Sequence, residues 1–159
     1  MIFVTVGTEL PFDRMVNIVD RWASDRGRSD VFAQIGEKGT PPKNINYASF
    51  LEPDEFKAKF EEASCIIAHA GMGTILTSLN YGKRLLVMPR KASLGEHRNE
   101  HQLATANHLL KLGKVTVSFN EEELYTKLDN LESITNSNKI GKYANEDLLT
   151  NLREFIAKS

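Results

Sequence analysis

Short runs of apolar residues alternate with amphipathic segments along most of the chain. A run of this kind, bounded by glycine or polar residues, predicts a buried β-strand. Six runs predict strands, at Ile2–Val6, Val31–Ile35, Asn46–Leu51, Cys65–Ala68, Arg84–Met88 and Lys114–Phe119. The segments between them predict helices, because their apolar residues recur at three- and four-residue spacing. We expect helices after Pro11, from Pro53, and at Thr74–Tyr81, Asn99–Leu112, Glu121–Leu128 and Glu146–Lys158.

Strands that alternate with helices are typical of a parallel sheet covered by helices. No repeat or internal boundary interrupts this pattern, so we predict one α/β domain over residues 1–159, with a single doubly wound, mainly parallel, Rossmann-like sheet. We predict that residues 140–159 carry its C-terminal helix, whose apolar residues make a continuous stripe. Two interpretations of the stripe stay open: it docks a partner protein, or it packs on the chain's own sheet.

Composition and charge limit the classes of function. The chain has 159 residues, of which 41% are hydrophobic and 26% charged, and its net charge is −1. We expect no nucleic-acid binding, which usually requires a basic surplus. The single cysteine, Cys65, allows no intrachain disulfide and fits a reducing cytosol. No apolar stretch approaches the roughly 20 residues that span a bilayer, and the N-terminus lacks the basic segment of a signal peptide, so we expect a cytoplasmic protein.

The candidate chemistry lies in the loops that follow the strands. Ligands of doubly wound sheets bind beyond the carboxyl ends of the strands, where three loops stand out: Gly7–Thr8, His69–Thr74 and Pro89–Gln102. In the second, a buried strand leads through His69-Ala-Gly-Met-Gly-Thr74 directly into a helix. Glycines let the backbone approach a ligand, and the N–H groups of a helix start favour an anion. We therefore predict a diphosphate site there; a tight turn without a ligand is the alternative.

Other nucleotide and metal sites fit the sequence less well. A Walker loop requires Gly-Lys-Ser/Thr, and a dinucleotide fingerprint requires three spaced glycines after the first strand, where Gly7 stands alone. The Asp-x-Asp motif of metal-dependent sugar transferases does not occur, and His97 and His101 lack a third zinc ligand. We expect a nucleotide site without a metal or other cofactor.

Individual residues of these loops allow more than one interpretation. His69 is a catalytic residue that gives a hydrogen bond or a positive charge to a leaving group, or it is a strand-end histidine bonded to neighbouring backbone. We interpret Glu96, His97 and Glu100 as residues of a solvated loop. Valine in place of Gly71 or Gly73 is expected to block ligand binding and to leave the fold largely intact.

Several segments together resemble a known family. His69-Ala-Gly-Met-Gly-Thr74, Val87-Met-Pro-Arg90 and Gly95-Glu-His-Arg-Asn-Glu-His-Gln102 resemble the C-terminal domain of glycosyltransferase family 28. The opening, Val4-Thr-Val-Gly-Thr-Glu-Leu-Pro-Phe-Asp13, is similar to the family's free-standing members. These are the PssE-like subunits of bacterial polysaccharide synthesis and the cytosolic subunit of the eukaryotic dolichol-linked N-acetylglucosamine transferase. The resemblance covers residues 1–120 and is closer to the bacterial group.

The resemblance implies an inverting, metal-independent GT-B enzyme that is split over two proteins. This chain would be the half that binds a UDP-sugar, equivalent to the C-terminal half of a GT-B enzyme. A membrane-anchored partner would supply the site for a lipid-linked glycan acceptor, and we expect it to supply the general base. The pair would transfer a hexosyl unit in polysaccharide or glycan biosynthesis, with this chain held at the membrane surface through its partner.

The resemblance also implies contacts with the UDP-sugar. These are Gly7 and Thr8 beside the phosphates, Phe50 and Leu51 at the uracil, Gly71, Met72, Gly73 and Thr74 at the diphosphate, and His101 and Gln102 at the sugar hydroxyls. Fused members and the eukaryotic subunit place a glutamate three residues after the matched threonine, where it binds the ribose diol. This chain has Thr77 there, and a hydroxyl bonds ribose less strongly than a carboxylate does.

Two other functions stay open. One is a non-catalytic regulatory module that binds a nucleotide-sugar, and the other is a stand-alone hydrolase or epimerase of the same compound. Turnover of a UDP-sugar by the chain alone would favour the second, and binding without turnover in the presence of its partner would favour the first.

Overall fold

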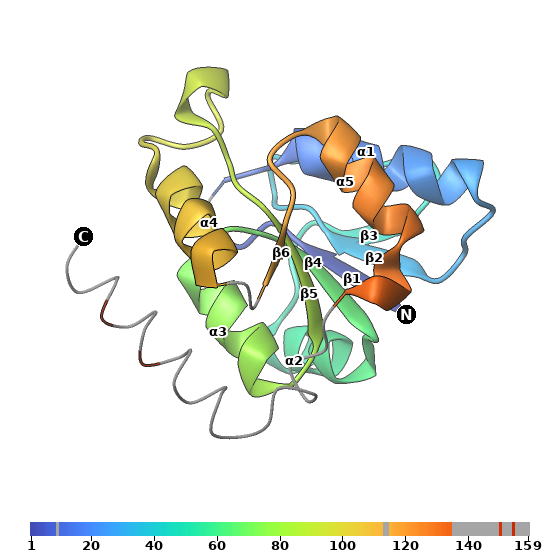
Figure 1. The fold of residues 1–159 in the computed structure, drawn as a ribbon. Coiled ribbons are helices and arrows are strands. Elements are labelled where there is room, and N and C mark those ends of the chain that lie inside the picture. The colour runs from blue at the N-terminus through green and yellow to red at the C-terminus, as the bar shows by residue number, and fades with distance from the viewer. Residues whose placement is uncertain (9, 113–114, 135–149, 151–153, 155–159) are drawn as a thin grey trace.

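The computed structural model describes residues 1–8, 10–112, 115–134, 150 and 154, and it contains one parallel sheet with helices on both faces (Figure 1). In chain order the elements are β1 (Ile2–Thr5), α1 (Asp13–Asp25), β2 (Val31–Gln34), β3 (Asn46–Ala48), α2 (Pro53–Glu62), β4 (Cys65–His69), α3 (Met72–Asn80), β5 (Arg84–Met88), the 3-10 helix η1 (Ala92–Leu94), α4 (His101–Leu112), β6 (Thr116–Val117), α5 (Glu121–Asp129) and the 3-10 helix η2 (Leu131–Ser133). The predicted helix Glu146–Lys158 lies outside the described residues, apart from Thr150 and Glu154, which are both helical.

The sheet has six parallel strands in the order β3-β2-β1-β4-β5-β6. This is the strand order of the Rossmann fold, and it confirms the predicted doubly wound sheet. Thr5 of β1 is level with Gln34 of β2 and with Ala68 of β4. The loops that follow these strands therefore leave the same edge of the sheet. The strand order reverses between β1 and β4, and ligands of such sheets bind at this switch point.

Two hydrophobic cores hold the helices on the sheet. Alternate side chains of β1 enter opposite cores, because successive side chains of a strand point to opposite faces. Val4 packs in the core under α1 and α5, and Phe3 packs in the core under α2, α3 and α4. Figure 1 shows α1 and α5 side by side on their face of the sheet. Each large apolar side chain that is fully buried contributes about 1.5–3 kcal/mol.

Several elements begin or end at other residues than the pattern predicts. The edge strands are shorter: β3 ends at Ala48, and β6 comprises only Thr116–Val117, because each has a neighbouring strand on one side alone. Helix α4 begins at His101. The start of α3 bears on function, because the helix begins at Met72 and not at Thr74. Its N-cap is Gly71, in extended conformation, so Met72, Gly73 and Thr74 form the first helical turn.

Candidate functional site

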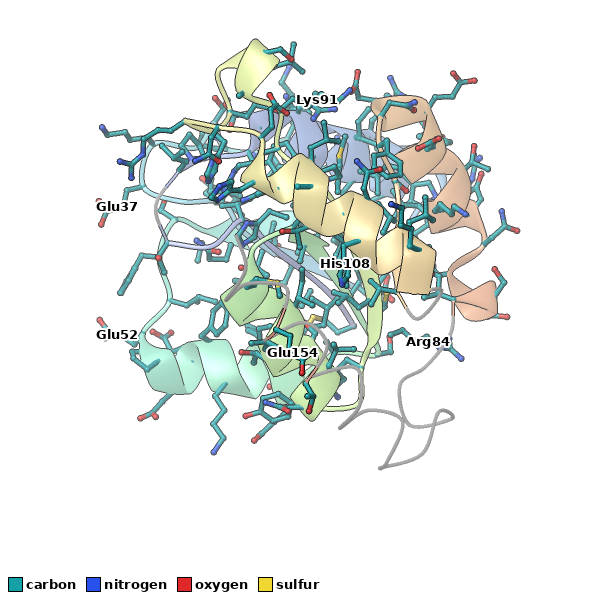
Figure 2. The ribbon with its side chains drawn as sticks, turned by 60° about the vertical axis from the view of Figure 1, so that its left-hand side comes forward. Glu37, Glu52, Arg84, Lys91, His108 and Glu154 are labelled. Carbon is teal, nitrogen blue, oxygen red and sulfur yellow. The ribbon has the colours of Figure 1, made fainter. Side chains whose placement is uncertain are left out.

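A cavity of about 650 Å³ opens at the switch point between β1 and β4. Small-molecule sites have volumes of roughly 300–1,000 Å³, so the cavity has the size of a ligand site. Glu37, beyond the carboxyl end of β2, is one of the residues that line it. Figure 2 shows Glu37 and Arg84, the first residue of β5, on opposite sides of the molecule. The cavity therefore opens at the carboxyl ends of the strands, as predicted for the ligand site.

The cavity brings together most of the residues predicted to bind substrate. The predicted residues on its wall are Gly7, Thr8, Phe50, Leu51, His69, Gly71, Gly73, Thr74, Thr77 and Gln102. Two predicted residues do not line it. Met72 packs half-buried against the core of α2, α3 and α4, and His101 is exposed at the start of α4. Roles for these residues in binding a UDP-sugar stay predictions.

The backbone at the start of α3 presents donors to the cavity. The first hydrogen bond of the helix runs from Ile75 N–H to the carbonyl of Gly71, at 3.1 Å. The N–H groups of Met72, Gly73 and Thr74 precede this bond and point out of the helix start. Gly73 and Thr74 line the cavity. The partial positive charge of the helix start is therefore directed at the space where a ligand would lie.

Glycine is required for different physical reasons at different positions of the site. A Cβ atom on Gly71 would lie 2.0 Å from His69 Cε1, and one on Gly7 would lie 2.7 Å from His69 Nε2, whereas real Cβ atoms essentially never approach within 3.0 Å of another atom. Gly7 and Gly71 therefore make room for the His69 ring. Gly73 is exposed, and a Cβ there would meet nothing within 4 Å. Only Gly73 matches the prediction of a glycine that leaves space for a ligand.

His69 is buried, at 8% exposure, and side chains bind both of its ring nitrogens. Arg90 Nη1 lies 3.2 Å and Gln102 Nε2 3.1 Å from His69 Nδ1, and Thr74 Oγ1 lies 3.3 Å from His69 Nε2. Burial, with the positive charges of Arg90 and His97, lowers the pKa of His69 to about 3. The ring is neutral at pH 7, so the interpretation of His69 as a positive charge is wrong. Its partners are also side chains, and not the neighbouring backbone of the alternative interpretation.

The buried cation of the cavity wall is Arg90, for which the sequence predicted no role. Its side chain is 3% exposed, and its Nη2 donates to the carbonyls of Val6 and Leu10. It also lines the cavity. A charged residue two positions after a buried strand was the available signal, because charges are rarely buried unless they are bonded.

Two buried amides fix the loops around the cavity. Gln102 Oε1 accepts from Ala70 N–H at 3.2 Å and from Arg90 N–H at 3.1 Å, so it ties the loop after β4 to the loop after β5. Gln34, which the sequence interpretation missed, accepts from the Thr5 hydroxyl at 2.7 Å and donates to the Gly7 carbonyl at 3.0 Å. A polar residue inside an otherwise apolar run was the signal for Gln34.

An ion pair holds the loop between β5 and α4, which rises above the sheet in Figure 1. Arg14 of α1 donates to Glu96 through Nε and Nη2, both at 2.9 Å. Glu96 also accepts from Lys91 N–H at 3.0 Å, and Glu100 accepts from Ala92 N–H at 2.8 Å. The interpretation of these carboxylates as part of a solvated loop is wrong for Glu96, which is 12% exposed and tied to α1. This loop carries the half-buried His97 to the cavity wall.

Among the described residues, no cluster of three or more His, Cys, Asp or Glu side chains is arranged to hold a metal ion. The same part of the chain contains no helix that is long and apolar enough to cross a membrane. The expected absence of a metal or other cofactor stays a prediction.

Fold and site together define a Rossmann-like α/β domain with a ligand cavity at its switch point. The model of the glycosyltransferase family 28 C-terminal domain matches residues 1–152, and the chain belongs to this family.

Individual relatives agree with this assignment. The UDP-N-acetylglucosamine transferase subunit ALG13 of Mus musculus is 32% identical over 121 residues, which are 70% of this chain and 10% of the mouse protein. The crystal structure of Acinetobacter baumannii MurG superposes with a TM-score of 0.62 at 18% identity, over 96% of this chain and 49% of that one. A solution structure of ALG13 superposes with a TM-score of 0.57 at 20% identity, over 80% of this chain and 83% of that one. At these identities the structures show the fold alone, which is that of GT-B glycosyltransferases.

The contact between Gly71 and His69 predicts that alanine at position 71 destabilises the protein. The histidine and its bonds would have to move, at a cost of about 1–3 kcal/mol. Gly73→Ala is the matched control, because it meets open space and removes the entropic penalty of glycine in a helix, roughly 0.5–1 kcal/mol. Urea unfolding measures both variants, and equal stabilities would contradict the contact. Valine at position 71, expected from the sequence to leave the fold intact, should therefore disturb it.

The neutral His69 predicts a loss of stability in acid. The unfolded chain binds a proton at this residue near the ordinary pKa of 6.5, whereas the folded chain binds it only near 3. This contribution to the free energy of unfolding is complete above pH 6.5 and is lost as the pH falls toward 3, with a limiting slope of about 1.4 kcal/mol per pH unit. Unfolding of the wild type and of His69→Gln, whose side chain does not titrate, should converge between pH 7 and about pH 4. Parallel pH profiles would rule out a buried neutral histidine.

Proposed function

We propose that this chain binds a UDP-sugar at the switch point and acts as the donor-binding subunit of a two-component, inverting, metal-independent glycosyltransferase. One observation carries the proposal: in a family 28 C-terminal domain, the first turn of α3 faces a cavity of nucleotide size. A helix start needs no metal to bind a diphosphate, because its N–H groups and dipole supply the positive potential.

The chemistry of the cavity wall supports one orientation of the nucleotide. The diphosphate lies at Gly73 and Thr74, where the helix N–H groups are directed. The uracil lies at Phe50 and Leu51, because this part of the wall is apolar and uncharged. Phe50 is 55% exposed, which leaves an aromatic face open to a base. The ribose lies near Thr77, whose hydroxyl donates to Gly73 O at 2.8 Å and keeps lone pairs that accept from a ribose hydroxyl.

The contribution of the chain to the reaction is electrostatic. As the bond between the sugar and UDP breaks, negative charge grows on the β-phosphate oxygens. The first turn of α3 stabilises this charge, and the buried guanidinium of Arg90 adds a fixed positive charge behind it. Loss of one preorganised donor of this kind typically costs roughly 3 kcal/mol. His69, neutral and bonded at both nitrogens, is not the general base, which we assign to the partner.

The second component of the proposed enzyme is a membrane-anchored subunit that binds a lipid-linked glycan acceptor. The superposition covers about half of the MurG chain, and the curated relatives are named as subunits. We propose that the pair transfers a hexosyl unit in polysaccharide or glycan biosynthesis, and that this chain is cytoplasmic and held at the membrane through its partner.

Relatives of the chain are named for a UDP-sugar, and the wall at Phe50 and Leu51 is uncharged, so we expect selectivity for the base. Calorimetry should detect binding of UDP, and ADP and GDP should bind at least about tenfold more weakly, which corresponds to 1.4 kcal/mol. The affinity for UDP should be the same in EDTA, because the helix start takes the place of a cation. Equal affinity for UDP and ADP would contradict the assignment of the base.

The split-enzyme proposal predicts that transfer requires two proteins. The purified chain should bind a UDP-sugar without turnover, and the addition of the membrane protein that co-purifies with it should start transfer to a lipid-linked acceptor. Hydrolysis or epimerisation by the chain alone would indicate a stand-alone enzyme. Binding without transfer in the complete pair would indicate a regulatory module.

A further inference from the structure

We infer that Arg90, Gln102 and His69 form a hydrogen-bond chain that directs the hydroxyl proton of Thr74 into the cavity, where it donates to a phosphate oxygen of the bound nucleotide. The inference rests on the proposed binding of UDP and assigns positioning roles within that site. It follows from five hydrogen-bond distances and from the donors and acceptors that each side chain possesses.

The first step fixes the orientation of the Gln102 amide. Gln102 Oε1 lies 3.2 Å from the N–H of Ala70 and 3.1 Å from the N–H of Arg90. Both partners are donors, so the atom that faces them is the amide oxygen. The amide nitrogen, which can only donate, is then the atom 3.1 Å from His69 Nδ1.

The second step fixes the tautomer of His69. Arginine has no acceptor, so Arg90 Nη1 also donates to His69 Nδ1, at 3.2 Å. Two independent donors meet at Nδ1, which therefore carries no proton. A neutral imidazole has one N–H group, and here it must be at Nε2. The backbone carbonyls of Val6 and Leu10 hold the Arg90 fork in place, so the tautomer is set by groups that do not depend on a ligand.

The third step fixes the hydroxyl of Thr74. His69 Nε2–H donates to Thr74 Oγ1 at 3.3 Å, so the hydroxyl oxygen is an acceptor on the side of the ring. Its single proton then points away from the ring. In the same helix, Thr77 and Ser78 donate to the carbonyls of Gly73 and Thr74, four residues earlier, at 2.8 Å.

Thr74 has no helical carbonyl four residues earlier to which its hydroxyl could donate. The carbonyl four residues before Thr74 belongs to Ala70, which precedes the first residue of the helix, Met72. The carbonyl three residues before it belongs to Gly71 and already accepts from Ile75 N–H at 3.1 Å. Thr74 itself lines the cavity. The proton of its hydroxyl is therefore directed toward the same space as the N–H groups of the first turn.

The charge of Arg90 polarises the hydrogen-bond chain from Arg90 toward Thr74. A cation that donates to Nδ1 polarises the ring, and hydrogen bonds in series strengthen one another in a buried setting. The Nε2–H of His69 becomes a better donor, and the Thr74 hydroxyl becomes a better donor in turn. Arg90 thus acts on the phosphate through two other side chains. His69 and Arg90 are positioning residues in this scheme, and Thr74 is the residue that touches the substrate.

The tautomer can be tested in the wild-type protein without any ligand. The chain has four histidines, and the signals of His69 are identified by their loss in His69→Gln. A two-bond nitrogen–proton correlation spectrum of the imidazoles at pH 7 should show His69 protonated at Nε2 alone. A proton at Nδ1, or a doubly protonated ring, would overturn the inference whether or not UDP binds.

The role of Thr74 is tested by comparing UDP with uridine, which lacks the phosphates. Thr74→Val keeps the shape of the side chain and removes the hydroxyl. It should lower the affinity for UDP by roughly tenfold to a hundredfold, the range for a hydrogen bond to a charged group. The affinity for uridine should be the same in Thr74→Val and in the wild type. Thr74→Ser should bind UDP like the wild type. Ser78→Ala, which removes a buried hydroxyl one turn further along α3, is the matched control and should leave both affinities unchanged.

The outcomes separate the inference from the proposed function. If the wild type binds no UDP, the proposed function fails, and the imidazole spectrum still decides whether the hydrogen-bond chain exists. If the wild type binds UDP and Thr74→Val binds it equally well, the inference fails and the proposed function stands. If Thr74→Val loses affinity for both UDP and uridine, the threonine has a structural role, and this outcome would also overturn the inference.

Discussion

The loops at the carboxyl edge of the sheet depend on one constraint, which is the burial of a guanidinium group. A buried charge is expensive unless hydrogen bonds replace those it made with water. Arg90 is 3% exposed, and it obtains such bonds from the carbonyls of Val6 and Leu10 and from the ring of His69. These partners belong to the loop after β1 and to the end of β4. The arrangement in which the three loops meet at the cavity keeps this cation bonded.

The sheet was predictable because burial leaves a local pattern: the run Arg84–Met88 matches β5 at both ends. The position of the cavity followed as well, since the parallel strands bring their loops to one edge. The internal bonds of the site were not predictable, because they join residues far apart in sequence. Arg14 and Glu96 are 82 positions apart, and nothing in the segment around Glu96 marks it as an ion-pair partner. The apparent helix start at Thr74 was wrong because Gly71 caps the helix from an extended conformation, which no apolar spacing reveals.

The motif residues divide into those that build the site and those that are open to a ligand. Gln102 has its oxygen bonded to two backbone N–H groups and its nitrogen to His69, so most of its hydrogen-bonding capacity lies inside the protein. Gly73 and Phe50, in contrast, are exposed on the wall of the cavity. Residues predicted to bind the same ligand therefore have different tasks, and the sequence spacing alone does not distinguish them. The difference lies in which atoms already have partners.

The ring of His69 between Gly7 and Gly71 also constrains how this sequence can change during evolution. Gly7 and Gly71 are 64 positions apart in the sequence, yet a Cβ at either glycine would overlap the same imidazole. A larger residue at position 71 becomes acceptable only after the histidine has been replaced by something smaller, and that replacement removes a partner of Arg90. Position 7 has a φ of +81°, which favours glycine whatever occupies the space beside it. Substitutions at contacting positions of this kind are not additive. Positions 69 and 71 should therefore vary together among descendants of this chain, or not at all.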